Sequence, residues 1–157
     1  MKLKSTILAV AALVVALFST TNEASAQDLA GWTGGAKVNF YTGWDTSSLG
    51  VYGRYTLNNG LRLEPSVSFI FAKGCTIDVT VDAHYIFDLG DKFEAYPLVG
   101  VSINDPGKFG FAANFGGGLG YKLSDVINLD LGMKWALQTQ SYISNPFIIS
   151  IGGGYKF

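Results

Sequence analysis

From Gly31 to the end of the chain, hydrophobic and polar residues alternate within segments of about eleven residues, and short polar or glycine-rich breaks separate the segments. Strict alternation is typical of a β-strand that presents one apolar face and one polar face. The unit repeats along the chain and predicts eight strands, at residues 31–41, 49–57, 61–71, 77–87, 93–103, 109–123, 127–137 and 147–157. The short breaks favour antiparallel neighbours, and the chain is therefore predicted to be all-β.

The two faces of these strands differ sharply in charge. One face consists of aliphatic and aromatic residues with glycine, alanine and proline, and it holds no charged side chain. The other face holds nearly all the charges of the strands: Lys37, Arg54, Arg62, Glu64, Asp78, Asp82, His84, Glu94, Lys122, Asp130, Lys134 and Lys156. Alternation alone does not decide which face points inward. A soluble barrel would turn the apolar face inward, and a membrane barrel would turn it outward.

The aromatic residues of the apolar face favour the membrane alternative. If the N-terminus is periplasmic, these residues fall into two bands, one near each rim of the sheet. One band comprises Trp32, Tyr55, Tyr85, Phe87, Phe93, Tyr121, Tyr155 and Phe157, and the other Phe40, Phe69, Phe71, Phe109, Phe111, Trp135 and Phe147. Transmembrane barrels place such aromatic girdles at the two membrane interfaces. A soluble core gives no reason to sort its rings by height.

Strand length and backbone hydrogen bonding lead to the same architecture. A tilted strand of about eleven residues rises roughly 28 Å, close to the ≈ 25 Å apolar band of outer-membrane barrels. An open strand edge in hydrocarbon would leave backbone groups unpaired, so the last strand is expected to pair with the first. We therefore expect an eight-stranded antiparallel up-and-down transmembrane β-barrel. Pro65 and Pro97 cannot donate to the ladder, and we expect a local bulge at each.

Composition sets limits on domain count and partners. The 157 residues have room for one domain, and the formal net charge of -1 gives no sign of a nucleic-acid partner. Only 15% of the residues are charged and 48% are hydrophobic, which is a low polarity for a soluble surface. Cys75 is the single cysteine, so an internal disulfide is excluded.

The N-terminus has the three parts of a secretory signal peptide. Lys2 and Lys4 form a positive region, residues 7–18 form an apolar run, and residues 24–26 read Ala-Ser-Ala, a small-residue cleavage site. A retained anchor is the alternative, but the apolar run is shorter than the roughly 20 residues of a spanning helix. We expect a cleaved signal peptide at 1–26 and a barrel domain at 27–157.

Three segments resemble a known family. They are the C-terminal FIISIGGGYKF at 147–157, YPLVGV at 96–101 and NFGGGLGYKLSD at 114–125. The whole mature chain resembles the bacterial outer-membrane β-barrel-domain family, a porin family that includes the small OmpX type and the OmpA membrane domain. The resemblance implies localisation in the bacterial outer membrane and a C-terminal assembly signal at Tyr155 and Phe157.

The resemblance also implies partners. They are outer-membrane lipids including lipopolysaccharide, the barrel-assembly machinery and periplasmic chaperones, and the protein is expected to be a monomer. One feature departs from family members that bind or adhere. Those members carry long outer loops, whereas the outer connections of this chain, at 42–48, 72–76, 104–108 and 138–146, are short. The expected function is accordingly a structural or surface-interaction role.

The charges of the polar face are expected to form a network inside the barrel. An eight-stranded barrel is only wide enough to be filled by side chains, and buried charges must be paired to offset desolvation. The inward glycines would leave room for the long side chains. The expected members are Arg54, Arg62, Glu64, Asp82, His84, Glu94, Lys122, Asp130 and Lys156. A plugged interior is the favoured interpretation, and a narrow channel for protons or small ions is the alternative.

His84 is the only histidine, and Asp82 with Ser66 or Ser68 would complete a set of residues suited to hydrolysis. His84 is expected to point into the barrel near the periplasmic end, away from outer-leaflet substrates. We therefore expect no catalytic residues, no cofactor and no metal site. A lipid-modifying outer-membrane enzyme is the weaker alternative, and a secreted soluble β-barrel with an apolar ligand is another.

Overall fold

The computed structural model describes residues 31–72, 76–90, 92–104 and 110–157. The predicted signal peptide at 1–26, Cys75 and Phe109 lie outside these residues. The described chain forms one antiparallel sheet of eight long strands and one two-residue strand. The strands are β1 (Trp32–Thr42), β2 (Thr46–Thr56), β3 (Leu61–Ile70), β4 (Thr76–Tyr85), β5 (Phe87–Asp88), β6 (Phe93–Asn104), β7 (Gly110–Lys122), β8 (Ile127–Gln138) and β9 (Phe147–Lys156).

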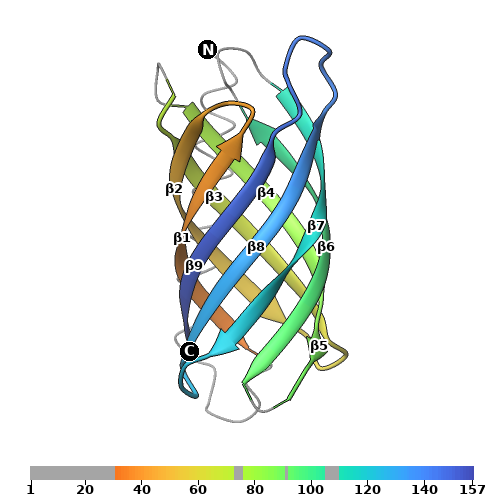
Figure 1. The fold of residues 1–157 in the computed structure, drawn as a ribbon. Helices are drawn as coiled ribbons and strands as arrows, with labels where there is room; N and C mark the ends of the chain where they lie inside the picture. Colours follow the sequence, from red (N-terminus) through yellow and green to blue (C-terminus); the bar gives the residue numbers. More distant parts are fainter. Residues whose placement is uncertain (1–30, 73–75, 91, 105–109) are drawn as a thin grey trace.

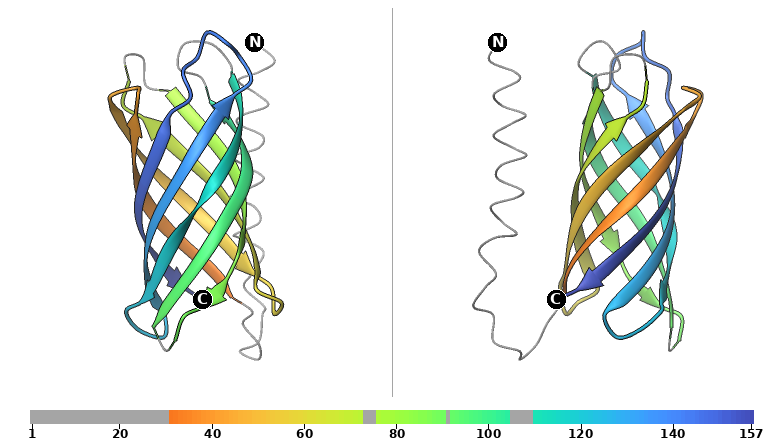
Figure 2. Two further views of the ribbon diagram at one scale, coloured as in Figure 1. Left: turned by 45° about the vertical axis from the view of Figure 1, so that its right-hand side comes forward. Right: turned by 90° about the vertical axis from the view of Figure 1, so that its left-hand side faces the viewer.

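The sheet closes into a barrel (Figure 1). Except for β4 and β5, strands that are consecutive in the sequence pair with each other. β1 pairs with β9, and the β4–β6 pairing completes the circle. The predicted eight-stranded antiparallel up-and-down barrel is confirmed. β1 begins and β9 ends at the same rim (Figure 2), which we call the termini end; the opposite rim is the loop end. The described residues contain no helix long and apolar enough to cross a membrane.

β2 begins three residues before its predicted start at Leu49. Its first residues, Thr46 to Ser48, are all polar, so hydrophobic alternation could not reveal them. Gly43 and Asp45 have φ values of +90° and +48°, and this left-handed backbone makes a turn tight enough for Thr46 to pair with Tyr41 at once. The loop-end connection between β1 and β2 is correspondingly short.

The predicted bulges at Pro65 and Pro97 are wrong. Pro65 pairs with Val81 and Pro97 with Gly117, and both ladders keep one register along their length. The missing N–H of Pro97 interrupts the ladder on the other side of β6. There, pairing with β4 ends at Leu98, and pairing resumes at Ala95, which is opposite Phe87 of β5. β5 is therefore the end of the predicted strand at 77–87. Hydrogen-bonded pairing is interrupted between β4 and β5, but the register on β6 stays the same, so no residue is inserted.

The apolar face of the sheet points outward. Val51, Leu131 and Phe69 are 63%, 42% and 51% exposed, whereas Arg54 and Asp82 inside the barrel are each 2% exposed. A soluble barrel that binds an apolar ligand would need the opposite arrangement. The structure therefore contradicts the prediction made by that alternative, that the apolar face lines a cavity.

Candidate functional site: the barrel interior

Glu64 lies between two cations contributed by neighbouring strands. Its Oε1 atom is 2.7 Å from the Lys37 ammonium of β1, and its Oε2 atom pairs with Nε of Arg54 on β2. All three side chains are buried. Inward positions on the three successive strands β1, β2 and β3 bring the groups together, and each carboxylate oxygen accepts from a different cation. This arrangement offsets the cost of burying the Glu64 charge.

Arg54 extends the cluster across the lumen to β8. Its Nη1 atom lies 3.1 Å from Oδ2 of Asp130, and the Tyr96 hydroxyl on β6 donates to the other oxygen of Asp130 at 2.5 Å. The Arg54 guanidinium also lies over the Tyr52 ring, 4.3 Å from its centroid, a distance suited to a cation–π interaction. One guanidinium thus links carboxylates from opposite walls.

Arg62 organises the part of the interior nearest the termini end. Its Nη1 atom is 2.6 Å from Glu94, and its Nε atom donates to Nδ1 of His84 at 3.1 Å. The His84 ring stacks on Tyr96 with centroids 4.6 Å apart, and the Arg62 guanidinium lies 4.7 Å from the same Tyr96 ring. The accepted hydrogen bond makes Nδ1 the unprotonated nitrogen of a neutral His84.

Asp82 forms a separate ion pair. Its Oδ2 atom accepts from the Lys134 ammonium at 2.7 Å, and its Oδ1 atom accepts from the Asn114 amide at 3.1 Å. We call these charges and tyrosines, the connected cluster together with the separate Asp82–Lys134 pair, the interior network. Its members are Lys37, Tyr52, Arg54, Arg62, Glu64, Asp82, His84, Glu94, Tyr96, Asp130 and Lys134.

Of the residues predicted for this network, the structure places Arg54, Arg62, Glu64, Asp82, His84, Glu94 and Asp130 inside the barrel. Lys122 and Lys156 lie at the termini-end rim instead. The Lys122 side chain is 47% exposed and lies 4.0 Å from Asp88. Both lysines occupy the last residues of their strands, where the inward face opens to solvent.

Sequence reasoning left four participants out of the predicted network. Lys37 and Lys134 are on the polar face, but their height in the barrel depends on strand stagger, which the sequence pattern does not give. Tyr52 and Tyr96 point inward, unlike nearly all the other aromatic residues of the strands. In β2 and β6 the odd-numbered residues point outward, so the even residue numbers of Tyr52 and Tyr96 were the available signal that these rings point inward.

Inward glycines make room for these side chains. A Cβ on Gly118 would collide with the hydroxyl of Tyr96 and would lie 2.7 Å from the Leu131 carbonyl oxygen. A Cβ on Gly100 would collide with the Asp82 carboxylate. The close approach of these side chains to the opposing backbone therefore requires glycine.

The half of the lumen toward the loop end is less charged. Asn39 donates to Ser48 at 2.8 Å and to Ser68 at 3.2 Å, and the Tyr41 hydroxyl donates to Asp78 at 3.3 Å. Beyond this layer lies an apolar cap, which consists of Tyr41, Ile70, Ala112, Ala136 and Ile148, with Trp44 and Ala72 packed against it. The cap separates the polar interior from the loop end.

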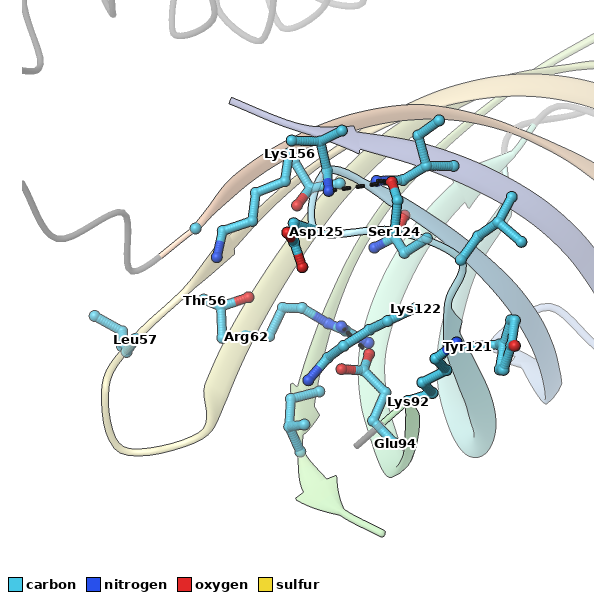
Figure 3. A pocket seen from close by; sticks show the side chains of 17 residues that line it. Thr56, Leu57, Arg62, Lys92, Glu94, Tyr121, Lys122, Ser124, Asp125 and Lys156 are labelled. Carbon is cyan, nitrogen blue, oxygen red and sulfur yellow. Dashed lines mark hydrogen bonds and ion pairs between the residues drawn. The ribbon is translucent and has the colours of Figure 1, made fainter. Parts of the chain in front are cut away.

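Little free space remains within the interior network. A cavity of about 20 Å³ lies among its side chains, and one of about 10 Å³ lies between Lys37, Lys134 and the polar layer toward the loop end. Each has room for about one water molecule. A larger cavity of about 770 Å³ opens at the termini end (Figure 3). We call this cavity the vestibule.

The candidate catalytic set is not assembled as a hydrolytic triad. His84 is 2% exposed and its Nδ1 atom accepts from Arg62, while Asp82 pairs with Lys134. Ser68 takes part in a hydrogen bond with Asn39. Within the described ranges, no group of three or more His, Cys, Asp or Glu side chains is placed to hold a metal ion.

No family model and no curated protein matches this sequence. Solved structures do match its fold. The N-terminal β-barrel domain of Pseudomonas aeruginosa OprF is 18% identical, with a TM-score of 0.67, over 81% of this chain and 97% of that chain. A de novo designed transmembrane β-barrel is 17% identical, with a TM-score of 0.65, over 83% and 98%. The outer membrane protein Ail of Yersinia pestis, studied in a phospholipid bilayer nanodisc, is 14% identical, with a TM-score of 0.53, over 80% and 99%. The fold is that of small outer-membrane β-barrels.

Proposed function

We propose that this protein is an integral protein of the bacterial outer membrane with a structural or surface-interaction role. The observation that carries the proposal is the apolar outer wall of the barrel. Large hydrophobic side chains on every long strand are exposed there, while the charged side chains of the network are buried inside. Monomeric soluble proteins rarely expose contiguous apolar patches larger than a few hundred Å². An apolar wall of this kind is suited to contact with the lipid acyl chains of a membrane.

Aromatic contacts at the two rims support membrane insertion. At the termini end the pairs Trp32–Tyr55 and Phe93–Tyr121 each have centroids 4.9 Å apart. Toward the loop end, Trp135 packs against Phe147 with a centroid distance of 4.8 Å. Rings at two heights match the two interfaces of a bilayer, and the described members of both predicted bands lie on the outer wall.

The proposal includes the partners expected from the sequence: outer-membrane lipids with lipopolysaccharide, periplasmic chaperones and the barrel-assembly machinery. Tyr155 and Phe157 are 51% and 62% exposed, which leaves the proposed assembly signal accessible. The Phe157 amide donates to the carbonyl of Trp32 at 3.0 Å, so this signal lies where the last strand joins the first. Since the barrel closes within one chain, we propose a monomer.

The interior is proposed to be a plug, with no catalysis and no cofactor. The ion pairs of Arg54, Glu64 and Asp130 connect the walls, and the apolar cap covers the loop end. The burial of His84 between Arg62 and Tyr96 argues against a lipid-modifying enzyme at the outer leaflet.

Membrane fractionation followed by gel migration with and without boiling tests the proposal. We expect the protein in the outer-membrane fraction, with a mobility in SDS that changes on boiling because a closed barrel resists the detergent. Recovery as a soluble periplasmic protein with one mobility would contradict membrane insertion.

A further inference from the structure

The vestibule at the termini end is a cavity that the proposed structural role leaves unused. Its walls include the turn after β2, the start of β6 and the turn between β7 and β8. With about 770 Å³ it falls in the range of small-molecule sites, roughly 300–1,000 Å³. Figure 3 shows the side chains of the lining, with Arg62, Lys122 and Glu94 close to one another.

The polar lining of the vestibule is predominantly basic. Four cationic side chains contribute to it, against two carboxylates. The cations are Arg62, Lys92, Lys122 and Lys156, and the carboxylates are Glu94 and Asp125. Among the described residues, Lys122 has only Asp88 as an ion-pair partner, at 4.0 Å, and Lys92 and Lys156 form no ion pair. The site therefore carries excess positive charge within a concave surface.

Arg62 adds a feature that exposed lysines do not provide. It is 3% exposed, and two of its three nitrogens are bound, Nη1 to Glu94 and Nε to His84. The third, Nη2, is buried with no acceptor among the described residues. Nη2 is closed to the vestibule as well as to solvent, so the contact that Arg62 offers an anion is at Nη1, where Glu94 lies 2.6 Å away.

We propose that the vestibule binds a phosphate-bearing anion of about nucleotide size. The guanidinium of Arg62 offers Nη1 to a phosphate oxygen, and Lys122 and Lys156 contribute charge from the rim. Glu94 forms an ion pair with Arg62, so an incoming phosphate competes with this carboxylate. Val126, in the turn between β7 and β8, is an apolar lining residue that contacts the rest of the ligand.

Calorimetric titration of the full-length barrel with inorganic pyrophosphate in zwitterionic detergent tests this site. We expect saturable binding that weakens as salt is added. Glu94→Gln should raise the affinity severalfold, because Arg62 loses its competing carboxylate. Lys122→Gln combined with Lys156→Gln should lower it by about tenfold, the effect of roughly 1.4 kcal/mol.

Asp45→Asn is the matched control for Glu94→Gln. It also removes one carboxylate, but at the loop end, and Asn tolerates the left-handed φ of +48° at this position. We expect its affinity to equal that of the unaltered protein. Equal gains from both variants, or no saturable binding by a barrel with heat-modifiable mobility, would overturn the proposal. The mobility control separates failure of this site from failure of the membrane barrel itself.

Phosphate could reach the vestibule from solution or from the headgroup of a neighbouring lipid. Repeating the titration in nanodiscs of phosphatidylcholine, with and without phosphatidylglycerol, distinguishes the two. A headgroup ligand predicts that phosphatidylglycerol weakens pyrophosphate binding severalfold, and a soluble ligand predicts an unchanged affinity. Either result, together with the Glu94→Gln gain, supports a phosphate site and identifies its source.

Discussion

The Tyr96 hydroxyl donates to Oδ1 of Asp130 at 2.5 Å and so reaches from β6 past Gly118 of β7 to β8. The same ring stacks on His84 and lies beneath the Arg62 guanidinium. Tyr96 therefore joins the ion pairs near the termini end to the pair of Arg54 with Asp130. A single aromatic residue links two parts of the interior network.

Tyr96→Phe should lower the free energy of unfolding by about 1–3 kcal/mol, because Asp130 loses a buried donor while the ring is retained. Urea unfolding of the barrel in lipid vesicles measures the change. Tyr155→Phe is the matched control, since Tyr155 lies on the outer wall and is 51% exposed. We expect an effect within about 0.5 kcal/mol for it. Equal effects of the two substitutions would contradict the role given to Tyr96.

Arg54→Met should destabilise the barrel by about 3–5 kcal/mol, because it leaves Glu64 and Asp130 with one buried cation fewer. Lys122→Met removes a cation that sequence reasoning placed in the same network. Its side chain is 47% exposed and its partner is 4.0 Å away, so we expect less than about 1 kcal/mol. Unfolding in urea compares the two. A loss of unfolding free energy well above about 1 kcal/mol from Lys122→Met would show that the network extends to the rim.

Gly118→Ala should destabilise the barrel by about 1–3 kcal/mol, because the new methyl group overlaps Tyr96 and the backbone of Leu131. Gly132→Ala is the control on the neighbouring strand. A Cβ there would meet Ser150 at 3.6 Å and Tyr96 at 3.7 Å, which are ordinary contacts. Melting followed by gel mobility ranks the two variants. Indistinguishable melting would show that the space at Gly118 is not limiting.

Trp44→Ala should loosen the connection between β8 and β9. The Trp44 ring stacks on Tyr41 at 5.4 Å, and its indole N–H donates to the Ser144 carbonyl at 3.1 Å. Tyr142 in the same connection is 63% exposed. We expect chymotrypsin to cleave after Tyr142 severalfold faster in the variant. Trp32→Ala at the other rim is the control, and faster cleavage there as well would indicate general loosening of the barrel.

The sequence predicts the strands well because a membrane barrel needs alternation along its whole length. The ends of β1, β3, β6, β7, β8 and β9 match their predictions within one residue. The start of β2 was missed because a polar run carries no alternation. The split between β4 and β5 arises from Pro97 on a neighbouring strand, so no local pattern could show it.

The interior was harder to predict than the strands. Alternation identifies which side chains point inward, but a contact such as Lys37 with Glu64 depends on strand tilt and stagger. The same limit explains why Lys122 and Lys156 were assigned to the network although they lie at its mouth. The inward tyrosines were outside the prediction because only the charged residues of the polar face were considered for the network.

Fluorescence quenching by brominated lipid tests the central claim, that the apolar wall faces hydrocarbon. Trp135 lies on the wall and is 49% exposed, whereas Trp44 packs against the apolar cap. Two variants, each retaining one of these tryptophans with the others replaced by Phe, would be reconstituted in phosphatidylcholine brominated on its acyl chains. We expect strong quenching of Trp135 and weak quenching of Trp44. Unquenched Trp135 in a correctly folded barrel would contradict a lipid-facing wall.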